Sequence, residues 1–128
     1  MSKKMNLQVG EYSLDLEVSR EILLDAFMEC PQMEDVMTKG KNPSISQLYK
    51  FTEVALFYMA SFNDSSFTRE KSKEIFDYAR ECIVEVENEN KEIVEQQAID
   101  VLVPKIMEFV NLGFTKQDNA KKIKITLS

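Results

Sequence analysis

The strongest constraint on the fold is an alternating segment at residues 5–16, which Gly10 and Glu11 interrupt once. Apolar and polar residues alternate on both sides of this dipeptide, as they do in two half-buried strands. A two-residue loop there places all the apolar side chains on one face, because side chains alternate along a strand. Glycine at the first loop position favours a type II′ turn. The sequence therefore predicts an N-terminal β-hairpin over residues 5–18, with Val9 opposite Tyr12, Leu7 opposite Leu14 and Met5 opposite Leu16.

A short amphipathic helix is expected directly after this hairpin. Ser19 can cap its first turn with a side-chain oxygen. Pro31 ends it, because the residue before a proline avoids the helical region. One or two further helical turns are expected at residues 32–38, before a loop that contains glycine and an Asn-Pro dipeptide.

The segment from Ser44 to Phe62 is expected to form a central helix. Ser44 and Gln47 have the spacing of a capping box at its start. A second apolar stripe that includes Phe51 and Tyr58 makes the helix apolar around most of its circumference, which is typical of a buried helix. In the alternative interpretation, Phe51 and Tyr58 belong to an exposed aromatic ridge that binds a protein partner.

Apolar residues continue at helical spacing from Thr68, a candidate N-cap, to Val103. One uninterrupted helix over this range would be about 54 Å long. A compact chain of this size has a radius of gyration of only about 14 Å. We therefore expect a break at residues 88–90, followed by a last helix over residues 91–112 that Pro104 kinks or splits. A single long helix is the alternative if the protein forms an extended oligomer.

Residues 122–127 alternate again and predict a third strand. Two strands alone are marginally stable, so we expect this strand to pair with the N-terminal hairpin. The predicted fold is α+β and mainly α, with a β-hairpin, this third strand and a bundle of four to five helices. We expect one domain over residues 1–128, with the hairpin at 5–18, a helical body at 19–112 and a tail at 113–128.

The chain of 128 residues contains no histidine. This absence excludes Ser-His-Asp and Cys-His catalysis and histidine-ligated zinc. Its carboxylates lie beside no glycine-rich phosphate loop or nucleophile motif, and Cys30 and Cys82 lack metal-binding spacing. We therefore expect no catalytic, cofactor-binding or metal-binding residues, and the sequence does not indicate an enzyme.

The formal net charge of −6 disfavours binding to nucleic acid or to an anionic membrane. It indicates either an acidic surface that keeps the protein soluble or, alternatively, a basic protein partner. No apolar stretch is long enough to span a membrane and no signal-peptide pattern is present, so a soluble cytoplasmic protein is expected. The most acidic run is either a docking surface for a basic partner or a solvated connection. It carries Glu85, Glu87, Glu89, Glu92 and Glu95 against one lysine, Lys91.

Near its start the chain reads Leu7-Gln-Val-Gly-Glu-Tyr-Ser-Leu-Asp-Leu16, and a short amphipathic helix and then further helices follow at once. This arrangement resembles the tail assembly chaperones of long-tailed bacteriophages. The resemblance covers residues 5–30. It implies a non-enzymatic protein in the cytoplasm of the bacterial host. Such a protein would bind the tape-measure protein, keep it soluble and help to recruit tail-tube subunits. The resemblance assigns no binding or catalytic residue.

A small acidic inhibitor of the immunity or antitoxin class is the competing hypothesis. Such a protein blocks a basic toxin by charge complementarity, and residues 85–95 would be its contact surface. A chaperone is expected instead to depend on apolar contacts and to be less sensitive to salt. The sequence leaves open whether the protein forms a homo-oligomer.

Overall fold

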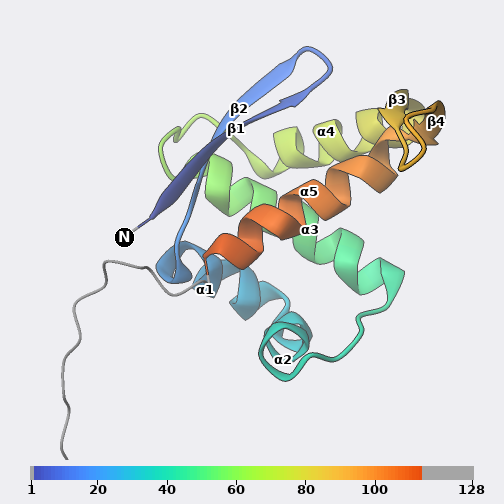
Figure 1. Cartoon of the computed structure of the whole chain (residues 1–128). Helices are drawn as coiled ribbons and strands as arrows, with labels where there is room; N and C mark the ends of the chain where they lie inside the picture. Colours follow the sequence, from blue (N-terminus) through green and yellow to red (C-terminus); the bar gives the residue numbers. More distant parts are fainter. Residues whose placement is uncertain (1, 114–128) are drawn as a thin grey trace, which may run out of the picture.

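The structure is a computed structural model that describes residues 2–113, and the strand expected at residues 122–127 lies outside this range. The α+β, mainly helical fold expected from the sequence is confirmed (Figure 1). The elements in chain order are β1 (Lys3–Val9), β2 (Tyr12–Val18), α1 (Arg20–Glu29), α2 (Pro31–Lys39), α3 (Ile45–Ser61), α4 (Arg69–Glu81), β3 (Ile83–Glu87), β4 (Ile93–Gln97) and α5 (Ala98–Leu112).

The β1–β2 hairpin has the register that the sequence predicts, with Val9 opposite Tyr12 at the loop. Gly10 has a φ of 58°. Lys91 is the one non-glycine residue in the described range with a positive φ, so Glu11 has the negative φ that a type II′ turn requires at its second position. The side chains on the face of the hairpin that carries Leu7 and Leu16 point toward the helices and join the hydrophobic core.

The expected helix caps are present. Ser19 Oγ accepts a hydrogen bond from the Ile22 amide at 3.2 Å, and Thr68 Oγ1 accepts one from the Lys71 amide at 3.2 Å. Both halves of the expected capping box also form at the start of α3. Pro31 occupies the first turn of α2, where its missing N–H removes no helical hydrogen bond.

Helix α3 lies at the centre of the molecule and contacts α1, α2, α4, α5 and β2. Its apolar residues form a large part of the hydrophobic core of the described residues, and Leu56 and Met59 are fully buried. In Figure 1, α5 passes in front of α3, and the β1–β2 hairpin runs alongside α5. The central position expected for this helix is confirmed.

The helical interpretation of residues 82–97 is wrong. This segment forms a second antiparallel hairpin, β3–β4, between the end of α4 and the start of α5 (Figure 1). The break expected near Asn88 is the turn of this hairpin, and α5 begins at Ala98 rather than at residue 91. The apolar spacing that suggested a helix also fits period two, and the many β-branched residues favour strands here. Pro104 lies inside α5, as expected.

Candidate protein-binding surface

We name residues 83–97 the acidic hairpin, and Asn88 organises its turn. The Asn88 amide donates to the Glu92 carbonyl at 2.9 Å, and its own carbonyl accepts from the Lys91 amide at 3.0 Å. Its side-chain Oδ1 accepts from the Asn90 and Glu92 amides at 2.9 and 3.0 Å. Lys91 has a φ of 61°, so the turn ends in a left-handed residue, as in a three-residue hairpin loop.

One face of the acidic hairpin combines exposed isoleucines with glutamates. Because side chains alternate along a strand, the paired positions Ile83–Gln97, Glu85–Glu95 and Glu87–Ile93 share this face. Ile83 is 63% exposed and Ile93 is 70% exposed. The apolar groups and the charges are therefore both available to a partner.

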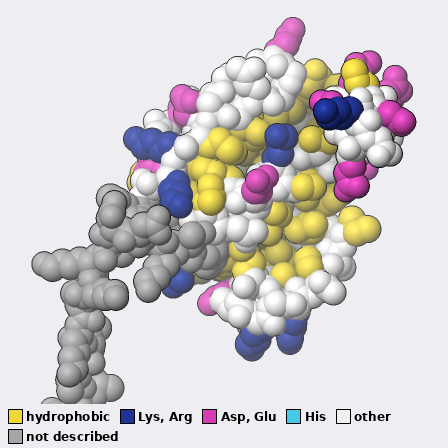
Figure 2. Space-filling view, in the orientation of Figure 1, with side chains coloured by type: hydrophobic (Ala, Val, Ile, Leu, Met, Phe, Trp, Pro, Cys, Tyr) yellow, Lys and Arg dark blue, Asp and Glu magenta, His cyan; other side chains and the backbone are white. Residues whose placement is uncertain are grey.

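The structure places all five glutamates of the predicted acidic surface on this hairpin, and all of them are exposed. Glu89 and Glu92 belong to the turn, and the other three lie on the strands. None of the five carboxylates makes an ion pair or a side-chain hydrogen bond with another residue in the range 2–113. Acidic side chains accordingly gather around this end of the molecule in Figure 2.

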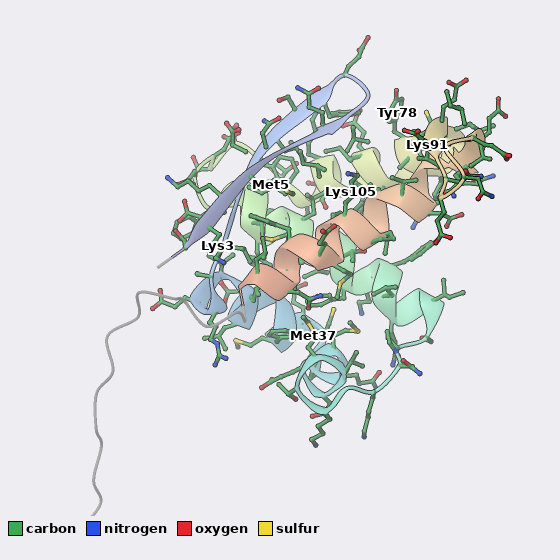
Figure 3. All side chains as sticks on the ribbon, in the orientation of Figure 1. Lys3, Met5, Met37, Tyr78, Lys91 and Lys105 are labelled. Carbon is green, nitrogen blue, oxygen red and sulfur yellow. The ribbon has the colours of Figure 1, made fainter. Side chains whose placement is uncertain are left out.

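A pocket of about 300 Å³ separates the two hairpins, and we name it the inter-hairpin pocket. Residues 7–10 line one side of it, residues 82–84 line another, and α5 forms its floor. Most of the lining is apolar, and among residues 2–113 Lys105 on α5 is the one charged residue that lines it. Figure 2 shows a band of hydrophobic side chains on this side of the molecule, and Figure 3 labels two lining residues, Tyr78 and Lys105.

Tyr78 supports the tip of the first hairpin at the edge of this pocket. Its ring packs edge-on against Tyr12, with the ring centroids 5.6 Å apart. It also lies so close beneath Gly10 that a Cβ at that position would lie 2.4 Å from the Tyr78 hydroxyl oxygen. A hydrogen bond with the Cys82 thiol raises the pKa of Tyr78.

A second hollow, an open groove along α4, lies on the other side of Tyr78. Tyr12 and Tyr78 form its aromatic wall. Its other lining residues are Glu70, Lys73, Glu74, Asp77 and Glu81. The inter-hairpin pocket is therefore flanked by carboxylates on two sides, at the α4 groove and at the acidic hairpin.

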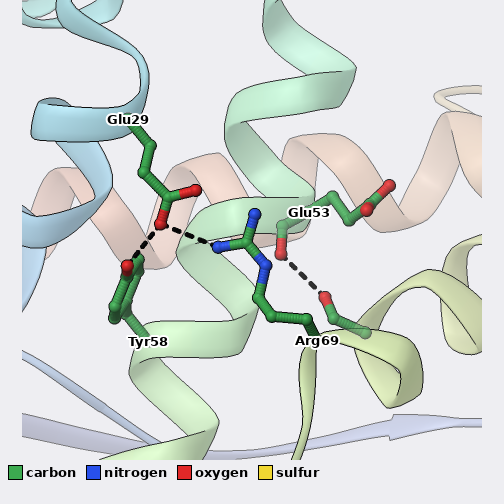
Figure 4. Close-up of polar contacts among 5 residues, drawn as sticks. Glu29, Glu53, Tyr58 and Arg69 are labelled. Atoms are coloured by element: carbon green, nitrogen blue, oxygen red, sulfur yellow. Dashed lines mark hydrogen bonds and ion pairs between the residues drawn. The ribbon is translucent and has the colours of Figure 1, made fainter.

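The two aromatic candidates from the sequence, Phe51 and Tyr58, do not form an exposed ridge. Phe51 is 0% exposed and stacks on Phe27 with the ring centroids 5.3 Å apart. Its assignment to a partner surface is wrong, because α1 packs over it through Phe27. Tyr58 is half-buried, and its hydroxyl donates a hydrogen bond to the Glu29 carboxylate (Figure 4).

Tyr58 belongs to a polar cluster that joins three helices. The same Glu29 oxygen accepts from Arg69 Nη1 at 2.8 Å, and the Arg69 guanidinium lies 5.2 Å from the centre of the Phe57 ring. The hydrogen bond to Glu29 raises the pKa of Tyr58 to about 12, and the bonds from Arg69 and Tyr58 lower the pKa of Glu29. The cluster ties α1, α3 and α4 together.

A fourth contact beside this cluster joins α3 to α4. Buried Ser72 donates from Oγ to the Glu53 carbonyl at 2.7 Å (Figure 4). The cluster and this bond join helices of the body, so we assign them a structural role.

Sequence reasoning missed the inter-hairpin pocket. Its lining comes from β1, α4, β3 and α5, and no local pattern indicates that these elements meet. The alternation at residues 83–87 was the available signal for the second hairpin.

No group of three or more histidine, cysteine, aspartate or glutamate side chains that could hold a metal ion occurs within residues 2–113. Over the same range, no helix combines the length and the apolar composition that crossing a membrane requires. Comparisons of the chain with protein-family models, with curated proteins and with solved structures gave no match.

Proposed function

We propose that this chain is a non-enzymatic assembly chaperone that holds a protein client at the acidic hairpin and the inter-hairpin pocket. The resemblance of the first hairpin to phage tail assembly chaperones suggests the client, a tape-measure protein, together with tail-tube subunits that the chaperone helps to recruit. The protein would act in the cytoplasm of a bacterial host.

The observation that carries this proposal is the exposure of Ile83 and Ile93 among unpaired glutamates. Full burial of an isoleucine side chain contributes about 1.5–3 kcal/mol. Two such side chains on a projecting hairpin would give a client an apolar contact, and the carboxylates around them would select a client with basic residues.

Co-expression with a tape-measure protein from a long-tailed phage tests this function. The soluble fraction of the tape-measure protein should rise with the wild-type chain and fall back with the double variant Ile83→Ser, Ile93→Ser. Met28→Ser is the matched control, because Met28 is 80% exposed on α1 and lines neither the inter-hairpin pocket nor the α4 groove. No gain in soluble client with the wild-type chain would contradict the proposal.

The second candidate is an inhibitor of a basic toxin, and the concentration of five exposed glutamates on one hairpin favours it. Salt distinguishes the two functions, because exposed charges are screened and apolar contacts are not. Inhibition of a toxin should weaken steeply with salt and with charge reversal at Glu87, Glu89 and Glu92. Client binding by a chaperone should depend more on Ile83 and Ile93.

A further inference from the structure

We infer that the occupant of this surface is an extended segment of another protein, which adds a strand to the open edge of β1, places an apolar side chain in the inter-hairpin pocket and directs basic side chains to the flanking carboxylates. This inference rests on the proposed function and specifies the conformation and chemistry of the client segment. It is carried by three features that meet at one place: an unpaired strand edge, an apolar hollow and the exposed carboxylates of the acidic hairpin.

The first feature is the free edge of β1. Within residues 2–113, β1 pairs with β2 alone. The two residues that flank a two-residue hairpin loop form a hydrogen-bonded pair. Hydrogen-bonded and non-hydrogen-bonded pairs then alternate along the two strands, so every second residue of β1 points its backbone N–H and C=O away from β2. Val9 and Leu7 therefore direct their backbone groups to β2, whereas Gln8 and Lys4 direct theirs to the open edge. An extended segment can pair with these groups, and a helix cannot, because its own backbone groups are already bonded.

The second feature is the position of the pocket along that edge. Four consecutive residues, 7–10, line it, so the pocket follows β1 rather than touching it at one point. A strand added beside β1 would place every second side chain on the face that carries Leu7 and Val9. That face turns toward the pocket, whose remaining walls include Val84 and Leu102. One such side chain would enter the pocket as an apolar anchor.

The third feature is the charge on the two flanks. In the α4 groove, Glu74 is paired with Lys71 at 3.3 Å and Asp77 with Arg80 at 2.8 Å, and Glu70 and Glu81 line it together with Lys73. The acidic hairpin presents its glutamates beyond Ile83 and Val84, which line the pocket itself. Lys105 is the charged residue of the pocket lining, so basic residues of the client belong beside the anchor rather than in the pocket. The segment that fits therefore alternates apolar side chains, which face the pocket, with basic side chains.

Binding of a labelled peptide with alternating lysine and isoleucine to the full chain tests this inference. A peptide of the same composition, with the lysines and isoleucines in two separate blocks, is the matched control for charge and hydrophobicity. The alternating peptide should bind more tightly and should slow amide hydrogen exchange at Gln8. Equal binding of the two peptides, or protection confined to the acidic hairpin, would overturn strand addition.

Two variants separate the strand edge from the pocket. Gln8→Pro removes a donor from the open edge while leaving the β1–β2 bonds intact, and should weaken peptide binding about tenfold relative to Gln8→Ala. Val101→Phe fills the pocket from α5 and should also weaken binding, whereas Met28→Phe should not. Circular dichroism melting checks that each variant folds. If a variant does not fold, amide hydrogen exchange at Gln8 in the wild-type chain, with and without the alternating peptide, still tests strand addition.

Two other occupants of the edge would overturn the inference. A wild-type dimer in light scattering that becomes monomeric with Gln8→Pro would assign the edge to a second copy of the chain. Much tighter peptide binding after removal of residues 114–128 would assign it to the chain's own C-terminal segment. The co-expression assay separates this inference from the proposed function. A client solubilised equally well by the wild type, Gln8→Pro and Val101→Phe would exclude strand addition and leave the chaperone function standing.

Discussion

Glu85 and Glu95 lie directly opposite each other across the acidic hairpin, and both are exposed. Like charges at directly opposed positions destabilise a strand pair. The exposed Ile83 and Ile93 occupy the same face, so this hairpin is stabilised neither by its charges nor by its apolar groups on that side. A basic segment with apolar side chains would neutralise the opposed glutamates and cover the exposed isoleucines, so binding should stabilise this hairpin.

Glu95→Lys should stabilise the hairpin and weaken client binding. The substitution replaces a repulsive cross-strand pair by an attractive one, worth about 0.2–1 kcal/mol. Urea denaturation measures the free energy of unfolding, and titration with the alternating peptide measures affinity. Glu108→Lys on α5 makes the same change in net charge at another exposed glutamate and is the control. An equal loss of affinity in both variants would show that only net charge matters.

Lys91→Gly should also stabilise the acidic hairpin, without changing its binding face. Lys91 has a φ of 61°, and a side chain in this left-handed conformation costs about 1 kcal/mol that glycine avoids. Amide exchange at Val86 and Val94, which pair across the hairpin, should slow. Lys91→Ala removes the same charge but keeps the β-carbon, so it should show no such gain. A similar gain in both variants would assign the effect to charge.

Gly10→Ala should destabilise the first hairpin by more than the roughly 1 kcal/mol expected from its positive φ alone. The added Cβ would lie 2.4 Å from the Tyr78 hydroxyl oxygen and would displace that ring. In a Tyr78→Ala background the collision is absent. The cost of Gly10→Ala in unfolding free energy should then fall to the roughly 1 kcal/mol that the positive φ accounts for. A double-mutant cycle of unfolding free energies measures this difference. Equal costs in the two backgrounds would contradict the contact.

The first hairpin and the helix caps were predictable because short-range geometry determines them. A two-residue loop between alternating segments allows one register, and Ser19, Ser44 and Thr68 each bond to amides a few residues away. The acidic hairpin was not predicted because its short apolar runs fit both a helical period and a period of two. Its β-branched composition, with isoleucine and valine on both strands, was the better guide.

The pocket and the burial of Phe51 depend on contacts between elements that are distant in the sequence. Periodicity showed that α3 is apolar on two sides, but the side that a partner could reach depends on where α1, α4 and α5 pack. Phe51 meets Phe27 of α1, whereas Tyr58 meets Glu29 and leaves part of its ring accessible. A list of apolar side chains cannot make that distinction, because the packing of other helices decides it.

The Glu29 cluster should make stability depend on pH at both extremes. Arg69 first, and then Tyr58, lower the pKa of Glu29 from its ordinary value of 4.5, so its contribution is present above that value and is lost as the pH falls through the folded-state pKa. The hydrogen bond to Glu29 raises the pKa of Tyr58 from 10.0 to about 12. The contribution of Tyr58 is therefore complete below pH 10 and is lost as the pH rises toward about 12.

Glu29→Gln should lower the unfolding free energy at neutral pH by about 1 kcal/mol, because a partly exposed ion pair and a hydrogen bond are both weakened. The loss should shrink as the pH falls below the ordinary carboxyl pKa of 4.5, since Glu29 is then protonated in the unfolded wild-type chain, and it should vanish once the pH passes the lowered pKa of the folded state. Urea denaturation across the acid range measures this convergence. Glu108→Gln, at an exposed glutamate outside the cluster, should show neither effect. A cost of Glu29→Gln that is constant over the acid range would contradict this prediction, because it would mean that the charge of Glu29 contributes nothing to the joint between α1, α3 and α4.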